Sequence, residues 1–257
     1  MNKQLKTGII IYVSFIIHYF LLKNFKLFKP WLDQYTQQGL VSYIIAYVLI
    51  GTPLFIGAYF VNRNSSIFQN LGLKSNILKG FLFSLLFTLP LFIGGLIFYK
   101  PNPEIEVQDM IAGTLIAGLM EELYYRGFLY GLLFKYTKLG FIPSILVGAI
   151  LFAIGHLYQS QNLGEMIGIF LITFLGAVFF AWLYTEWKFN LWIPIFTHTF
   201  MNLAWYVFNI DESALGSLTA NILRGLTIAI AILFTFYTKK KQHDKLAIYK
   251  ATLWMKQ

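Results

Sequence analysis

Long apolar stretches alternate along this chain with short polar connections. Eight of the stretches approach or exceed the length of about 20 mostly apolar residues that a membrane-crossing helix needs. They cover residues 7–22, 41–61, 77–99, 108–134, 141–157, 165–185, 191–208 and 218–237. None of the connections is long enough for a separate soluble domain. The pattern predicts an all-α, polytopic transmembrane helix bundle of about eight helices, forming a single integral membrane domain over residues 1–257.

The composition supports a membrane protein. Apolar residues make up 58% of the 257 residues and charged residues only 12%, whereas soluble domains carry about 25% charged residues. A soluble fold could not cover its surface with so few charges. The chain has no cysteine, which excludes disulfides, cysteine zinc ligands and a nucleophilic thiol.

The distribution of basic residues predicts how the bundle lies in the membrane. With the N-terminus in the cytoplasm, fourteen Lys and Arg fall in inner segments, including a basic tail over 238–257, and four fall outside. An excess of Lys and Arg marks cytoplasmic segments, so both termini are expected there. The first outer connection is discordant because it carries three of the four outer lysines, which are Lys23, Lys26, Lys29 and Lys100.

The basic residues behind the net charge of +9 are therefore expected to orient the helices in the membrane and to contact anionic membrane lipid. No nucleic-acid partner is expected. The predicted location is a cell membrane crossed several times. The absence of cysteine and the abundance of Ile, Phe, Lys and Asn favour a bacterial plasma membrane.

Polar side chains inside the predicted spans are few. They fall in the fourth, fifth and seventh stretches, as Glu121, Glu122 and Arg126, then His156 with Phe152 one turn before it, then His198 and Asn202. An unpaired charge at membrane depth costs about 2.5–3.5 kcal/mol on insertion scales. We therefore expect these groups to face one another or a hydrated cavity.

Helical spacing separates the two glutamates. Glu122 and Arg126 are four residues apart and can form an ion pair on one helix face. Glu121 points about 100° away from Glu122, which leaves its carboxylate free. A free carboxylate in an apolar site can act as a general base that activates water.

The histidine motifs add hydrogen-bonding groups. His198 and Asn202 project from one helix face and can donate hydrogen bonds to a developing oxyanion, while Phe152 can pack on the ring of His156. Counting about 1.5 Å per residue from each predicted interface places Glu121 and His198 in the inner half of the membrane. The same count places His156 about 10 Å nearer the outer side.

Two chemistries remain open for this set. Glu121, His156 and His198 can ligate a divalent metal such as zinc, with water in the fourth position. The same side chains can also activate and orient water without any cofactor.

The three motifs, Glu-Glu-x-x-x-Arg, Phe-x-x-x-His and His-x-x-x-Asn, occur in this order on successive hydrophobic segments. They resemble those of the CAAX protease and bacteriocin-processing family (CPBP, or Abi) of intramembrane proteases. The resemblance covers a protease core over about 108–208, and the stretch 190–194 before His198 is also similar to the family.

The resemblance implies an intramembrane endopeptidase that acts on a peptide or protein substrate in the membrane, such as a peptide pheromone, a bacteriocin, a leader peptide or a protein C-terminal tail. Glu121 would activate water together with His156, and His198 and Asn202 would stabilise the oxyanion. Supporting roles would fall to the remaining motif residues, Glu122, Arg126 and Phe152.

Two other functions fit the same motifs. A non-catalytic scaffold or bacteriocin-immunity protein would bind a membrane-protein partner such as a sensor kinase, and Glu121→Ala would leave its function intact. A transporter would use Glu121, His156 and His198 as a proton relay, and would show proton-coupled solute flux without peptide cleavage.

Overall fold

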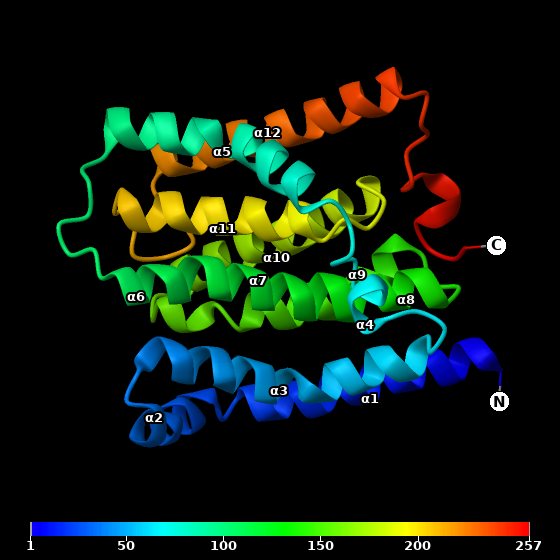
Figure 1. Cartoon of the computed structure of the whole chain (residues 1–257). Coiled ribbons are helices and arrows are strands. Elements are labelled where there is room, and N and C mark those ends of the chain that lie inside the picture. Colours follow the sequence, from blue (N-terminus) through cyan, green and yellow to red (C-terminus); the bar gives the residue numbers. More distant parts are fainter. Residues whose placement is uncertain (1, 257) are drawn as a thin grey trace.

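A computed structural model describes residues 2–256, and it confirms the all-helical bundle (Figure 1). Six helical segments are long and apolar enough to cross a membrane by length and composition. Five of them are single helices, namely α1 (Lys3–Leu22), α3 (Gly39–Val61), α5 (Ile77–Phe98), α10 (Leu163–Glu186) and α12 (Leu218–Lys241). The sixth combines α9 (Phe141–Ile154) with the short turn η3 (Leu157–Gln159).

The other two predicted spans are helical but not uniform. The fourth is one continuous helix over residues 107–136 that changes its winding along its length. It is built from α6 (Val107–Met110), η1 (Ile111–Ile116), α7 (Ala117–Glu121), η2 (Glu122–Tyr130) and α8 (Gly131–Tyr136). η1 and η2 are π-helical. This winding is rare in proteins overall, and where it occurs it is often at a functional site. The seventh span is α11 (Trp192–Val207), with only 16 residues.

The first outer connection is a helix, α2 (Phe25–Thr36), which the sequence interpretation missed. Its 12 residues are too few to cross a membrane, and its polar residues hid it from a search for apolar stretches. Lys29 forms an ion pair with Asp33 one turn later, at 2.8 Å, and α2 packs on α3. Two of the three discordant lysines of this connection, Lys26 and Lys29, thus belong to this helix.

The helices form layers around the 107–136 helix (Figure 1). α1, α2 and α3 lie on one side of it, and α5 and α12 lie on the opposite side of the bundle, beyond α10 and α11. Both ends of the chain lie at one end of the bundle, as the charge distribution predicts. We name this the inner end and the opposite one the outer end.

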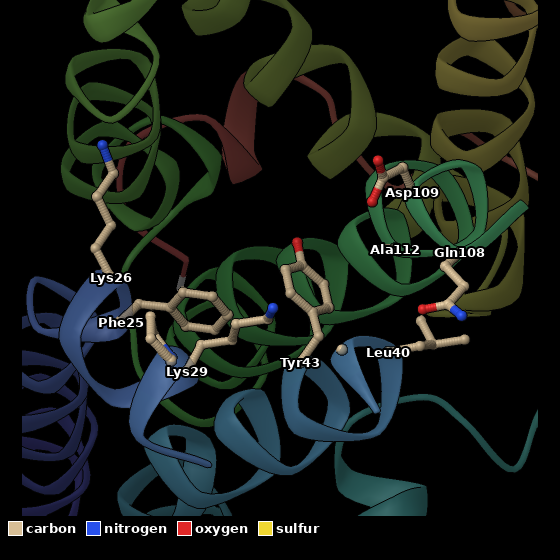
Figure 2. A pocket seen from close by; sticks show the side chains of 10 residues that line it. Phe25, Lys26, Lys29, Leu40, Tyr43, Gln108, Asp109 and Ala112 are labelled. Carbon is tan, nitrogen blue, oxygen red and sulfur yellow. The ribbon is translucent and has the colours of Figure 1, made fainter. Parts of the chain in front are cut away.

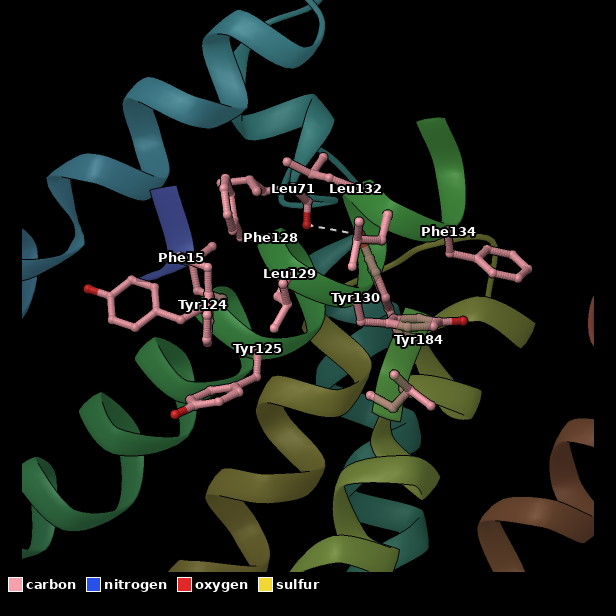
Figure 3. Close-up of a cluster of buried hydrophobic side chains, with 14 of the residues drawn as sticks. Phe15, Leu71, Tyr124, Tyr125, Phe128, Leu129, Tyr130, Leu132, Phe134 and Tyr184 are labelled. Carbon is pink, nitrogen blue, oxygen red and sulfur yellow. Dashed lines mark hydrogen bonds between the residues drawn. The ribbon is translucent and has the colours of Figure 1, made fainter. Parts of the chain in front are cut away.

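The inner half of the central helix is the core of the protein. Every residue from Glu122 to Phe134 is buried. Figure 3 shows the aromatic side chains of this stretch, among them Tyr124 and Phe128, packed with Phe15 of α1 and Tyr184 of α10. This packing closes the bundle between the middle of the helix and its inner end.

α11 begins deep inside the bundle, because two non-helical segments meet there. The backbone N–H of Leu191 donates to the carbonyl of Gly72 at 3.3 Å, and Trp192 Nε1 donates to Leu73 at 2.9 Å. Gly72 has a φ of +87°, and a Cβ there would lie 2.3 Å from a backbone oxygen, so only glycine fits. Non-helical backbone is tolerated at membrane depth when protein satisfies it in this way.

The start of α11 bears on the position of His198 within the bundle. Leu191 contacts Gly127, nine residues before the inner end of the central helix at Tyr136. α11 therefore begins within the bundle, and the depth of His198 in the membrane stays a prediction. The rings of His156 and His198 both lie near Phe152, with centroids 4.5 and 6.5 Å from its ring.

The basic tail is ordered and packs against the inner end of the bundle. α12 continues to Lys241, and the chain then returns so that the backbone N–H groups of Ala247 and Ile248 donate to the Glu186 carboxylate at 3.0 and 2.9 Å. Lys239 pairs with the same carboxylate at 2.9 Å. The N–H of Gly140 donates to the carbonyl of Trp254 at 2.7 Å, so the tail links α10 and α12 to the start of α9. The short helix η4 (Lys250–Thr252) lies within it.

We expect Glu186→Ala to release the tail. The substitution removes the acceptor of two backbone N–H groups and leaves the ammonium of Lys239 largely buried without its partner, which costs about 3–5 kcal/mol for a buried pair. Trypsin should then cleave after Lys245 and Lys250 much faster than in the wild type. Glu165→Ala, which removes an exposed carboxylate bonded to Ser160, is the matched control. A tail that stays equally resistant in both variants would contradict this anchor.

Candidate active site

The carboxylate of Glu122 lies at the centre of the polar cluster. Its Oε1 is 3.1 Å from Nη1 of Arg126 and 2.8 Å from Nδ1 of His198. The side chains of Glu122 and Arg126 are fully buried. The predicted ion pair is thus confirmed, and its carboxylate also binds the histidine of α11.

This contact fixes which nitrogen of His198 carries a proton. A carboxylate only accepts hydrogen bonds, so Nδ1 of His198 donates to Glu122. The other nitrogen, Nε2, then faces Oε2 of Glu121 across 3.9 Å. That separation exceeds a direct hydrogen bond and leaves space for a water that contacts both groups. The side chain of Glu121 is 25% exposed while that of Glu122 is 0% exposed, in agreement with the prediction that Glu121 is the free carboxylate.

His156 lies just beyond the last residue of α9. Its Nδ1 is 2.7 Å from the carbonyl oxygen of Phe152, an unpaired acceptor of the last helical turn. Because a carbonyl only accepts, Nδ1 carries the hydrogen and Nε2 presents a lone pair. The ring packs on Phe152 with centroids 4.5 Å apart, as predicted. Within residues 2–256 no ion pair joins His156 to Glu121, so their joint action on water stays a prediction.

Two phenylalanines enclose the charged groups. The guanidinium of Arg126 lies 4.4 Å from the ring centroid of Phe152 and 5.4 Å from that of Phe180. Phe180 also stacks on His198, with centroids 5.2 Å apart and an angle of 15° between the rings. Phe180 of α10 was not a candidate, because nothing marks it among the 26 phenylalanines of the sequence. Rings on a buried cation supply cation–π attraction and exclude water.

Asn202 lies one turn beyond His198 on α11, as its spacing predicts. Its Nδ2 donates to the carbonyl of Gly113 in η1 at 3.3 Å, at the outer margin of the cluster. The amide is thus positioned near His198, and its role at an oxyanion stays a prediction.

The side chains do not form a metal site in this structure. Among the described residues, no three His, Asp or Glu side chains come close enough to hold one ion. The Nδ1 hydrogen bonds of His198 and His156 leave Nε2 of each ring free, so the separation of the side chains is the reason that no site forms. The zinc set of Glu121, His156 and His198 that the sequence left open is not assembled here.

Residues 103–204 match the family model described as type II CAAX prenyl endopeptidase Rce1-like. The resemblance to CAAX proteases is confirmed. The CAAX protease-like segment begins before α6, ends within α11 and includes all seven candidate residues. α1, α2, α3 and α12 lie outside it.

A curated relative agrees with this match. The chain is 30% identical over 93 residues to a Bacillus subtilis (strain 168) protein named "Putative membrane peptidase YdiL". The similarity covers 36% of this chain and spans about a third, 34%, of the relative's length. No solved structure matches the chain significantly.

Proposed function

We propose that this protein is an intramembrane endopeptidase that hydrolyses peptide bonds in membrane-associated peptides or protein tails. The observation that carries the proposal is the open carboxylate of Glu121, which faces Nε2 of His198 across 3.9 Å beside a buried ion pair. The similarity of this segment to CAAX endopeptidases supports it. Peptide pheromones, bacteriocins and their leaders are the substrates we propose.

The reaction needs one water and one proton acceptor. Water held between Glu121 and His198 loses a proton to the Glu121 carboxylate as its oxygen attacks the carbonyl carbon of the scissile amide. The C–O bond forms and the carbonyl becomes an oxyanion. When the C–N bond breaks, protonated Glu121 returns the proton to the leaving nitrogen. The products are a carboxylic acid and an amine, and Glu121 ends as it began.

The other residues orient this chemistry. Glu122 holds the ring of His198 through Nδ1, and Arg126 contacts the same carboxylate oxygen of Glu122. The amide of Asn202 can turn from Gly113 to donate to the oxyanion, and preorganised donors of this kind contribute about 10²–10³-fold in rate. Nε2 of His156 is available as a second acceptor for the attacking water.

Comparative peptidomics tests the proposal in cells that carry the wild type, Glu121→Ala or His156→Ala at matched expression. We expect discrete peptide products in the wild type that disappear in both variants. Identical profiles in all three strains, with a phenotype that only deletion produces, would favour the scaffold function instead.

Metal chelation gives a second measurement. Because the three zinc candidates are not assembled, the proposal routes no step through a metal, and we expect cleavage by the purified protein to survive prolonged treatment with 1,10-phenanthroline. The same treatment applied to a known zinc peptidase verifies the chelator. Loss of cleavage that added zinc restores would show that the ligand set assembles around the ion.

A further inference from the structure

A cavity of about 540 Å³ opens at the outer end of the bundle (Figure 2). Its walls come from α2, from the first turns of α3 and from the start of the 107–136 helix. The lining combines apolar and charged residues, namely Phe25, Lys26, Lys29, Leu40, Tyr43 and Asp109, among others. Its size is that of a pocket for a small molecule or a short peptide segment.

The central helix is more completely buried on the inner side of Glu121 than on the outer side. Residues 122–134, toward the inner end, are all buried. Toward the outer end Gly113 is exposed, and a Cβ built on it would meet no atom within 4 Å. The outer part of the helix is therefore the less enclosed side from which water and substrate could approach Glu121.

A chain of phenols leads from the cavity to the catalytic helix. Tyr43, on the cavity wall, lies 3.5 Å from the hydroxyl of Tyr47. The carbonyl of Tyr47 accepts a 2.6 Å hydrogen bond from Tyr124, which stands three residues after Glu121. Tyr124 and Glu121 lie about one turn apart on the same helix, so these hydrogen-bonded tyrosines connect the cavity wall to the helix that carries Glu121.

The cavity presents one free charge of each sign. Lys29 is paired with Asp33 at 2.8 Å, and its hydrogen bond lowers the pKa of that carboxyl from its usual value. Lys26 and Asp109 have no ion-pair partner among the described residues. Figure 2 shows them on opposite sides of the opening, Lys26 on α2 and Asp109 on α6.

We propose that this cavity is the substrate subsite through which peptides reach the active site from the outer face of the membrane. It takes a short extended segment with an acidic group against Lys26 and a basic group against Asp109. The inference rests on the proposed peptidase function and narrows it to exported peptides or external segments of membrane proteins, to the exclusion of cytoplasmic tails.

The absence of cysteine from the chain allows a test of entry that needs no catalysis. Ala112→Cys places one small thiol on the cavity wall, and Lys138→Cys places one at the exposed turn of the inner end. In intact cells we expect a membrane-impermeant maleimide to label Ala112→Cys and to label Lys138→Cys only after permeabilisation. Labelling of Ala112→Cys only after permeabilisation, or not at all, would overturn the inference.

Peptide protection tests the charges. A synthetic hexapeptide with lysine at one end and aspartate at the other should slow the labelling of Ala112→Cys several-fold. A matched peptide with glutamine and asparagine at these ends should not. Adding Lys26→Glu should abolish the protection, whereas Lys100→Glu, at an exposed outer lysine outside the cavity, should preserve it. Equal protection by both peptides, or an inert Lys26→Glu, would overturn the assignment.

The two proposals fail in different ways. Outer labelling and charge-dependent protection without any Glu121-dependent cleavage would keep the binding cavity and reject the peptidase. Cleavage that depends on Glu121 in a protein whose Ala112→Cys reacts only from the inner side would keep the peptidase and reject the outer entry.

Discussion

Glu121→Gln should lower the rate of peptide cleavage by about 10²–10⁴-fold, the usual contribution of a general base, while the protein stays folded. Glutamine keeps the shape of the side chain and its approach to Nε2 of His198, but its amide cannot take a proton from water. Because substrate contacts are unchanged, the loss should fall on kcat with KM little altered. The measurement is product formation by mass spectrometry, with purified protein in proteoliposomes.

The control for this variant is Glu104→Gln, an exposed carboxylate in an outer connection, which should cleave like the wild type. Activity of Glu121→Gln within twofold of the wild type would reject the mechanism. If neither the wild type nor Glu121→Gln cleaves peptides, and Glu121→Gln still supports the physiological role, the scaffold function is favoured. Proton-coupled solute flux that disappears in Glu121→Gln would favour the transporter.

Arg126→Met should destabilise the fold by about 3–5 kcal/mol, the cost of breaking a buried ion pair by removing one partner. Methionine fills much of the space between Phe152 and Phe180, so the loss comes from the uncompensated charge of Glu122 at 0% exposure. Cleavage should fall as well, because Glu122 then no longer has a fixed position against His198. Thermal unfolding in detergent micelles measures the change.

A double-variant cycle separates charge from packing. Glu122→Gln with Arg126→Met removes both charges, and its stability should exceed that of Arg126→Met, since it no longer buries the Glu122 carboxylate without its cation. Cleavage should not return. Arg63→Met, at a cation over the ring of Phe60, is the control. Additive effects in the cycle would show that the two charges are not coupled.

The sequence was sufficient for the helices and for contacts within one helix. Apolar length predicted every long span, and a separation of four residues predicted both the Glu122–Arg126 pair and the packing of Phe152 on His156. The contact of Glu122 with His198 could not be predicted, because it depends on where α11 begins. That depth is set by Leu191 against Gly127, a packing relation that hydropathy does not contain.

Three other features of the structure could not be predicted from apolar stretches or from the polar residues within them. α2 is too short and too polar to resemble a span, although its residues are ordered on α3. Phe180 is apolar in an apolar helix, and only its stacking on His198 distinguishes it. The tail attaches through backbone N–H groups to Glu186, and backbone donors are common to all non-proline residues.

The shortness of α11 bears on the membrane around it. Its 16 residues extend about 24 Å, less than the hydrocarbon thickness of about 30 Å. Acyl chains that contact its half-buried side chains Trp192, Phe196 and Phe200 would shorten or tilt to match it, at a cost of fractions of a kcal/mol per Å. Lipids with short chains meet this edge with less elastic distortion than lipids with long ones. The host's acyl-chain composition thereby becomes one determinant of how stably the helices of the candidate active site are held together.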